Sequence, residues 1–162
     1  MAKNLFPVLV DLNDKIQNLD QNVLINTIIK RPEVSKLITE LNTGGQNTSQ
    51  LLELHVDAEG ISLSSQGGGY SDFTLENARP KKTGRDDINL RQTGDYYKTV
   101  KIKFDSLAND YFNIISNPIK DGDNIEENFG GNILGLIDSN WEIVQKFMTP
   151  LLIGLLLESV EL

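Results

Sequence analysis

The C-terminal segment of the chain has the sequence DSNWEIVQKFMTPLLIGLLLESV (residues 138–160), which is the clearest helical pattern in the protein. Ser139 followed by Glu142 matches a capping box and predicts the start of the helix. Pro150 removes a main-chain donor inside the pattern, and Gly154 weakens the same region. We therefore expect either one bent helix or two short helices. The apolar stripe at helical spacing consists of Ile143, Phe147, Leu151 and Leu155, widened by Val144, Leu152 and Leu156.

The N-terminal third carries two more helical patterns. Leucine and isoleucine recur over residues 5–19 at a 4-3-4-3 spacing, and this pattern continues to Ile29. Pro32 suits the first turn of a second helix. Gly44-Gly45 interrupts that pattern before residues 50–54 resume it. We expect residues 1–54 to be helical, with these apolar faces in the core more often than at a partner. The buried face of the second helix is predicted to contain Val34, Leu37, Ile38 and Leu41.

Residues 55–97 are predicted to form a long loop that passes into an extended basic segment. Turn-forming residues dominate 57–60 and 64–69, and residues 76–92 are polar and basic with little periodicity. A compact monomer has little reason to keep such a long connection. In an assembly, this segment can reach a neighbouring subunit.

A β-hairpin is predicted over residues 98–117. Residues 99–104 alternate apolar or β-branched side chains with lysine, and residues 110–115 form the second candidate strand. The lysines on the wet face guard the edge against unwanted pairing. The sequence thus predicts a single α+β domain over 1–162, with N-terminal helices, a long loop, a small antiparallel sheet and a kinked C-terminal helix packed on it.

Charge is unevenly distributed along the chain. The net charge of −8 opposes nucleic-acid binding as the main task, because phosphate contacts need a basic surface. Residues 76–103 contain eight basic and four acidic side chains, so this segment carries +4 and the remainder carries −12. Such a separation suits contact between copies, or with a partner of different charge. The alternative is a solvated loop in which basic residues cluster by chance.

The residues that carry chemistry are sparse. The chain has no cysteine and one histidine, His55, so thiolate and histidine metal clusters are excluded. Its glycine runs lack the residues of a Walker loop or a dinucleotide fingerprint, and residues 121–123 lack the full calcium-loop pattern. We expect no cofactor, no metal and no enzymatic activity. A carboxylate hydrolase using Asp86, Asp87 or Asp95 is the remaining enzymatic alternative.

The sequence also bears on the compartment. No secretory signal pattern is present at the N-terminus. The longest apolar stretch, residues 151–157, is far shorter than the roughly 20 residues of a membrane span. We therefore expect folding in the cytoplasm and no membrane contact.

Three stretches resemble the phage virion morphogenesis and tail-completion family, which includes the Mu-type morphogenesis proteins and their head–tail joining relatives. They are YSDFT (70–74) with the basic tract that follows through Lys82, NLRQTGDYYKTV (89–100), and FGGNILGLIDSNW (129–141). In that family a Tyr/Pro–Thr element leads to lysines and Leu-x-x-Thr-Gly, then to a hairpin, and a Leu-Gly-Leu stretch introduces the final helix. The resemblance covers about residues 32–160. The glycines at 44–45 and 67–69 look like insertions, and the aromatic-rich approach to the last helix is sparse.

The resemblance implies a virion structural protein of a tailed bacteriophage, made in the host cytoplasm. It would be a homo-oligomeric ring subunit for tail completion or head–tail joining in the neck, either a connector or a tail terminator. Its partners would be its own copies and other neck, tail or portal-adjacent proteins, and DNA would pass through the lumen without specific binding. The alternative is an acidic phage-encoded regulatory module that binds a host protein outside the particle. The candidate subunit-interface residues are Tyr70, Arg79, Lys81, Lys82, Arg85, Tyr96 and Tyr97; the tyrosine rings suit either core or interface.

Overall fold

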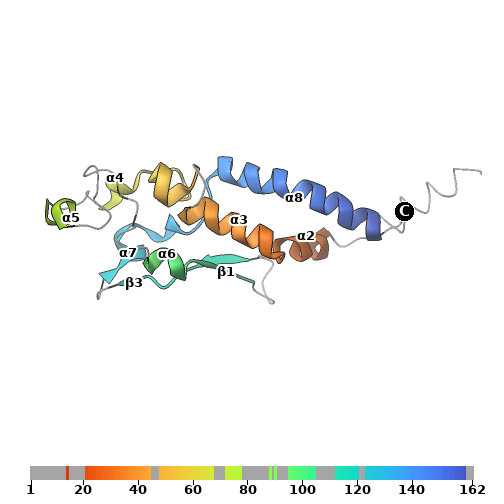
Figure 1. Cartoon of the computed structure of the whole chain (residues 1–162), viewed down its shortest axis with the longest axis horizontal. Helices are drawn as coiled ribbons and strands as arrows, with labels where there is room; N and C mark the ends of the chain where they lie inside the picture. The colour runs from red at the N-terminus through yellow and green to blue at the C-terminus, as the bar shows by residue number, and fades with distance from the viewer. Residues whose placement is uncertain are drawn as a thin grey trace, which may run out of the picture.

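The structure is a computed structural model, and it describes residues 14, 21–44, 48–67, 72–77, 88, 90, 95–104, 112–120 and 123–159. Within these residues the chain has the α+β architecture that the sequence predicts, with several helices, small antiparallel strand pairs and a long C-terminal helix (Figure 1). The helix predicted over 5–19 lies outside the described residues apart from Asp14, which is helical.

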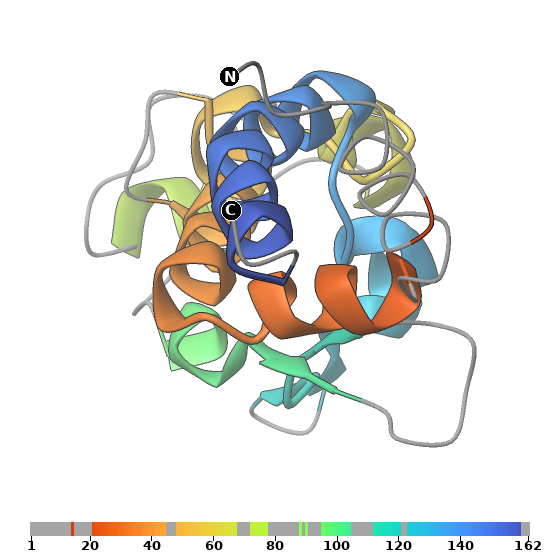
Figure 2. The ribbon, with the colours of Figure 1, turned by 90° about the vertical axis from the view of Figure 1, so that its right-hand side faces the viewer.

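Three helices form the upper part of the molecule in Figure 1: α2 (Gln21–Ile29), α3 (Pro32–Thr43) and α8 (Asp138–Ser159). Figures 1 and 2 show α8 lying along the α2–α3 pair, with strand β1 on the other side of that pair. The second predicted helix is confirmed with its proline at the first turn. Its C-cap is Gly44 at φ 136°, a backbone conformation that favours glycine, so the predicted interruption is confirmed there.

The first core cluster lies between these helices and the sheet. Val34, Ile38 and Leu41 follow helical spacing along one face of α3, which is why they enter the core together. The ring of Phe112 packs against that of Trp141 in α8, with centroids 5.9 Å apart. The other buried members of the cluster are Ile28, Leu136 and Val144.

The predicted hairpin is confirmed as a two-stranded antiparallel sheet of β1 (Lys101–Lys103) and β2 (Asn113–Ile115). Ile102 lies opposite Ile114, and both pack on the first cluster, while Lys101 and Lys103 are exposed. The alternation of lysine and apolar residues along the strand therefore gives the sheet one buried face and one exposed face. A second small ladder pairs β3 (Ile119–Lys120) with β4 (Asp123–Asn124) in antiparallel fashion.

The prediction of a loop over residues 55–97 is wrong in three places. Short helices form at α4 (Leu63–Gly67), α5 (Asp72–Asn77) and α6 (Asp95–Thr99). Buried Asp57 explains the first of them. Its carboxylate accepts hydrogen bonds from the main-chain N–H groups of Glu59 and Ile61, and from the side chain of Gln66 in α4. Residues 78–87, 89 and 91–94 of the basic segment lie outside the described residues.

A second core cluster joins α4, α6 and the segment before α8. Its buried members are Leu51, Leu63, Ile88, Tyr96, Val100 and Ile133. Leu51 comes from a single π-helical turn, η1 (Gln50–Leu54), which confirms that helical structure resumes after the glycines. Ile133 comes from η2 (Gly131–Ile133), which follows the short helix α7 (Ile125–Asn128).

Helix α8 begins at Asp138, so the predicted cap residue Ser139 lies inside the first turn and the capping-box prediction is wrong. The carbonyl of Ile137 accepts from the N–H groups of Asn140 and Trp141 and closes that turn. Pro150 lies within the helix, which continues without interruption to Ser159. Of the two outcomes expected at the proline, one helix is therefore observed and two short helices are not.

Candidate association surfaces

The sequence-predicted interface residues divide into two groups in the structure. Tyr96 and Tyr97 lie on α6, which leads into strand β1. Tyr96 belongs to the second core cluster, and Tyr97 packs against it. The other five lie outside the described residues: Tyr70, Arg79, Lys81, Lys82 and Arg85.

Tyr96 is a core residue, with only 3% of its surface exposed. Its hydroxyl is buried and forms no hydrogen bond with a described residue. The hydroxyl of Ser116, which lies nearby, donates to the Glu126 carboxylate. Burial raises the pKa of Tyr96 to about 12; the Ser116 hydroxyl opposes this shift, and the Glu126 carboxylate adds to it. A partner has no access to this ring in the folded chain, so Tyr96 is corrected from interface to core.

Tyr97 is half-buried and packs against the edge of the same cluster. Its ring is tilted by 56° to that of Tyr96, with centroids 6.2 Å apart. Helix α6 itself begins at Asp95, directly after the Thr93-Gly94 pair. The YYK portion of the motif therefore anchors strand β1 to the core and leaves one tyrosine partly accessible.

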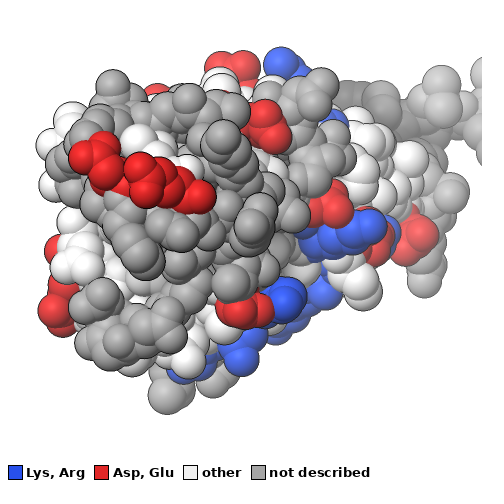
Figure 3. All heavy atoms as spheres, turned by 60° about the vertical axis from the view of Figure 1, so that its left-hand side comes forward, with Lys and Arg blue, Asp and Glu red and all other residues white. Residues whose placement is uncertain are grey.

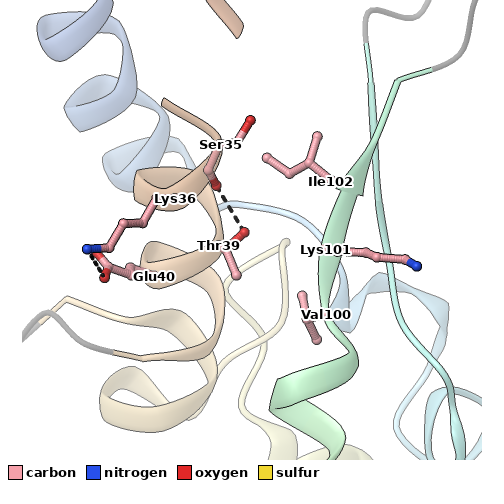
Figure 4. Close-up of a pocket in the computed structure, with 7 residues that line it drawn as sticks. All are labelled: Ser35, Lys36, Thr39, Glu40, Val100, Lys101 and Ile102. Carbon is pink, nitrogen blue, oxygen red and sulfur yellow. Dashed lines mark hydrogen bonds and ion pairs between the residues drawn. The ribbon is translucent and has the colours of Figure 1, made fainter. Parts of the chain in front are cut away.

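A groove of about 380 Å³ lies between α3 and the start of β1 (Figure 4). Ser35 and Thr39 of α3 lie on one side of it, and Figure 4 shows Ile102 of β1 pointing toward them. Thr39 Oγ1 donates to the carbonyl of Ser35 at 3.0 Å, so its hydroxyl is committed to the helix. The remaining lining residues are Lys36, Glu40, Val100 and Lys101.

The surroundings of this groove are positively charged. Lysines and an arginine outnumber carboxylates six to three over residues 30–40 and 95–103, although the whole chain carries −8. Three of these cations have partners: Lys36 pairs with Glu40, Lys98 with Asp95, and Lys30 lies over the Phe104 ring. Figure 3 shows one face of the molecule, where the described Lys and Arg gather in one region and a compact group of Asp and Glu lies in another. The six cations are Lys30, Arg31, Lys36, Lys98, Lys101 and Lys103.

The second candidate surface is the C-terminal half of α8. Ile153 and Leu157 are 52% and 48% exposed, and Phe147, in the other half of the helix, is 40% exposed. All residues from 150 to 157 are apolar, so these two turns of the helix have no polar face to present to water. A helix that is apolar all round is normally buried on all sides. We call the exposed residues Ile153 and Leu157, which lie one turn apart on the same face of the helix, the α8 apolar stripe.

The polar side chains His55 and Asp57 are held in local contacts. The described residues contain no group of three or more His, Asp or Glu side chains placed to hold a metal ion. His55 ends η1 in a left-handed conformation (φ 55°), and its Nε2 lies 2.9 Å from the carbonyl oxygen of Leu52. Asp57 is used in its own turn. These two polar side chains therefore have structural partners.

Sequence reasoning missed both surfaces as sites. The signal for the groove was the small pair Ser35 and Thr39, which lie one turn apart on α3 opposite an edge strand. The feature of the sequence that indicates the α8 apolar stripe is the unbroken apolar run 150–157, because it places apolar side chains on every face of the helix.

None of the helices in the described ranges is both long enough and apolar enough to cross a membrane. No protein-family model, curated protein or solved structure matches this chain.

Proposed function

We propose that this protein is a structural subunit that acts by associating with other protein chains, and that it serves as a ring subunit in the neck or tail-completion region of a tailed-phage virion. The α8 apolar stripe is the observation that carries the first part of this proposal. Removing apolar surface from water contributes about 25 cal/mol per Å². Exposed apolar patches of this kind are typical of association sites on soluble proteins.

The arrangement of the two surfaces supports a ring. Closed rings form through a heterologous interface, in which two different surfaces of the subunit meet. Helix α8, which carries the apolar stripe, and strand β1, which borders the groove, lie on different sides of the α2–α3 pair (Figures 1 and 2). One subunit can therefore contact two neighbours at once.

The place in the virion rests on the three motif stretches and their order. The stretch at 129–141 leads through η2 into α8, and residues 95–100 lead through α6 into β1. Both motifs thus introduce elements that carry the candidate surfaces. The net charge of −8 supports a lumen that passes DNA without holding it, since like charges repel.

Native mass spectrometry and sedimentation velocity of the purified chain test the association. We expect a concentration-dependent closed oligomer for the wild type, and a shift toward monomer for Ile153→Lys. Gln145→Lys is the matched control, because Gln145 is exposed on the polar half of the same helix. Equal oligomer populations for the two variants would show that the α8 apolar stripe is not an association surface.

The virion assignment has its own test. Mass spectrometry of purified particles from cells that make this chain should detect it at a low, fixed copy number per particle. If the chain instead stays in the particle-free fraction as a monomer or dimer bound to a host protein, the ring-subunit assignment is wrong and the acidic regulatory module is favoured.

A further inference from the structure

Three buried polar groups have no hydrogen-bond partner where the end of α3 meets η1 and the segment before α8. They are the side-chain oxygen Oδ1 of Asn42, the hydroxyl of Ser49 and the side-chain nitrogen Nε2 of Gln50. Each of these residues is completely buried, with 0% of its surface exposed. Most buried polar groups in native proteins have at least one hydrogen-bond partner. Three exceptions within one junction therefore call for a common explanation.

The other contacts of these residues hold the three groups close together. Asn42 Nδ2 donates to the carbonyl oxygen of Gly135 at 2.8 Å, and Gln50 Oε1 accepts from the main-chain N–H of Ile137 at 2.8 Å. Gly135 and Ile137 are two residues apart, so their Cα atoms are separated by at most about 7.6 Å. Ser49 directly precedes Gln50 in the chain. The two side-chain amides and the hydroxyl are thus held at neighbouring points of one short segment.

Hydrogen-bond chemistry fixes which end of each amide is left over. Asn42 Nδ2 points at the carbonyl oxygens of Ile133 and Gly135, which can only accept, so Oδ1 is the remaining atom. Gln50 Oε1 accepts from a main-chain N–H, which can only donate, so Nε2 is the remaining atom. The unpaired groups are therefore one acceptor, one donor and a hydroxyl that can act as either.

Ser49 is the N-cap residue of η1, and its hydroxyl does not take the usual role at this position. A serine N-cap normally accepts a hydrogen bond through its side-chain oxygen from an N–H of the first turn. The Ser49 side chain forms no such bond, and its main-chain carbonyl accepts from the N–H groups of Glu53 and Leu54. The hydroxyl is thus left to serve a partner inside the junction.

We propose that an ordered water molecule binds in this junction, accepting a hydrogen bond from Gln50 Nε2, donating one to Asn42 Oδ1 and forming a third with the Ser49 hydroxyl. Buried waters typically form about three hydrogen bonds to polar groups that otherwise lack partners. A cation would face the protons on Gln50 Nε2, and an anion would face the Asn42 oxygen. A small neutral molecule that both donates and accepts fits all three groups. The inference is independent of the proposed function.

The water joins the two halves of the hydrophobic core. Leu41, next to Asn42, belongs to the first core cluster, and Leu51, next to Gln50, belongs to the second. Hydrogen bonds through the water connect the end of α3 to the start of η1, which are far enough apart to need a bridge. A polar contact between groups that do not meet directly is commonly mediated by water in this way.

Nuclear magnetic resonance tests the site in the whole chain. Overhauser effects between water and the Gln50 side-chain amide protons are measured in the laboratory frame and in the rotating frame, at a pH where amide exchange is slow. A water molecule that tumbles with the protein gives effects of opposite sign in the two frames, whereas surface water gives the same sign. We expect opposite signs at Gln50. Gln145, an exposed glutamine on α8, is the matched control and should show equal signs.

Two substitutions at Ser49 separate bound water from exchange of the hydroxyl proton. Ser49→Ala removes that proton and leaves two partners for the water, so the Gln50 signal should persist. Ser49→Val places methyl groups in the junction, displaces the water and should abolish the signal. Ser49→Val should also melt at least about 5 °C below Ser49→Ala, because the unpaired atoms of Asn42 and Gln50 then have no partner at all.

Each result either supports or overturns the water site. A Gln50 signal of opposite sign that persists in Ser49→Ala and vanishes in Ser49→Val supports it. The proposal is wrong if the signal is absent, has the sign of surface water, or disappears in Ser49→Ala. If Ser49→Val does not fold, a crystal structure of the wild type decides. A water about 2.7–3.2 Å from both Asn42 Oδ1 and Gln50 Nε2 is expected, and a direct hydrogen bond between these two atoms would overturn the proposal.

Discussion

The side-chain amide of Asn140, in the first turn of α8, donates to the carbonyl oxygen of Leu41 in α3 at 3.2 Å and to that of Thr48 at 3.0 Å. Asn42 forms the matching connection from α3, to the carbonyls of Ile133 and Gly135 at 3.2 and 2.8 Å. Both asparagines are buried. They satisfy main-chain carbonyls where α3 ends and α8 begins, and so fix the two helices to each other.

Replacing Asn140 with alanine should lower the free energy of unfolding by about 2–3 kcal/mol, because two carbonyl groups lose a buried donor. Chemical denaturation measures this change. Asn132→Ala is the control: the Asn132 amide also forms a hydrogen bond, to Glu59, but on the exposed surface. Asn132→Ala should lower the free energy of unfolding by less than about 0.5 kcal/mol. Equal effects at the two sites would mean that burial of the Asn140 contacts contributes nothing.

Stability should depend on pH through Tyr96. The pKa of its phenol is about 12 in the fold against 10.0 for the ordinary side chain, mainly because burial disfavours the phenolate. Above pH 10 the unfolded chain loses this proton first, so the stabilisation is complete below pH 10 and is lost as the pH rises toward 12. The loss should be about 2–3 kcal/mol.

Tyr96→Phe checks the assignment of that loss. The variant should be about as stable as the wild type at pH 7, since the hydroxyl has no described partner, and it should lose less stability between pH 10 and 12. In an absorbance titration of tyrosinate, the highest-pH component should vanish in Tyr96→Phe and persist in Tyr97→Phe. The reverse pattern would assign the high pKa to Tyr97.

Two glycines should respond to alanine in opposite directions. A Cβ on Gly135 would lie 2.6 Å from the Cβ of Ala58, so Gly135→Ala forces the segment before α8 away from the Asp57 turn and should cost about 1–3 kcal/mol. Gly154 lies inside α8 with open space around its Cβ position. Gly154→Ala should therefore stabilise the fold by about 0.5–1 kcal/mol. Thermal melts distinguish the two, and a stabilised Gly135→Ala would contradict the close approach.

Leu63 tests whether α4 belongs to the core. It is fully buried in the second cluster, so Leu63→Ala should cost about 2–4 kcal/mol through lost burial and a cavity. Leu54 is the matched leucine with substantial exposure, and Leu54→Ala should cost less than about 1 kcal/mol. Urea denaturation provides both values. A small loss of stability for Leu63→Ala would show that α4 does not belong to the core and that the segment behaves as the loop predicted from its composition.

The long periodic patterns were sufficient to predict the main helices and the first hairpin. Pro32, Val34 and Ile38 define α3, and the alternation around Ile102 defines β1, because a repeat of 3.6 or 2 residues places side chains on one face regardless of context. The predicted start of α8, with Ser139 as the cap, was wrong by two residues, since the helix begins at Asp138. Local sequence did not show that the Ile137 carbonyl closes the first turn.

Short elements were beyond the reach of local patterns. A five-residue helix such as α4 has too few hydrogen bonds to be stable alone. It forms because Leu63 enters a core built from distant segments and because Asp57 binds Gln66. The same holds for Tyr96, since nothing in YYK indicates which ring turns inward.

The sequence by itself determined the α+β class, the apolar faces of α3 and α8 and the charge separation, since each depends only on residue type and spacing. The tertiary structure alone decided that Tyr96 is buried, that Ser35 and Thr39 border a groove beside β1, and that half of α8 stays exposed. These features depend on which distant surfaces meet. Helix α8 packs on α2 and α3 with one side only. The opposite side, around Ile153, is also apolar and is left exposed to water.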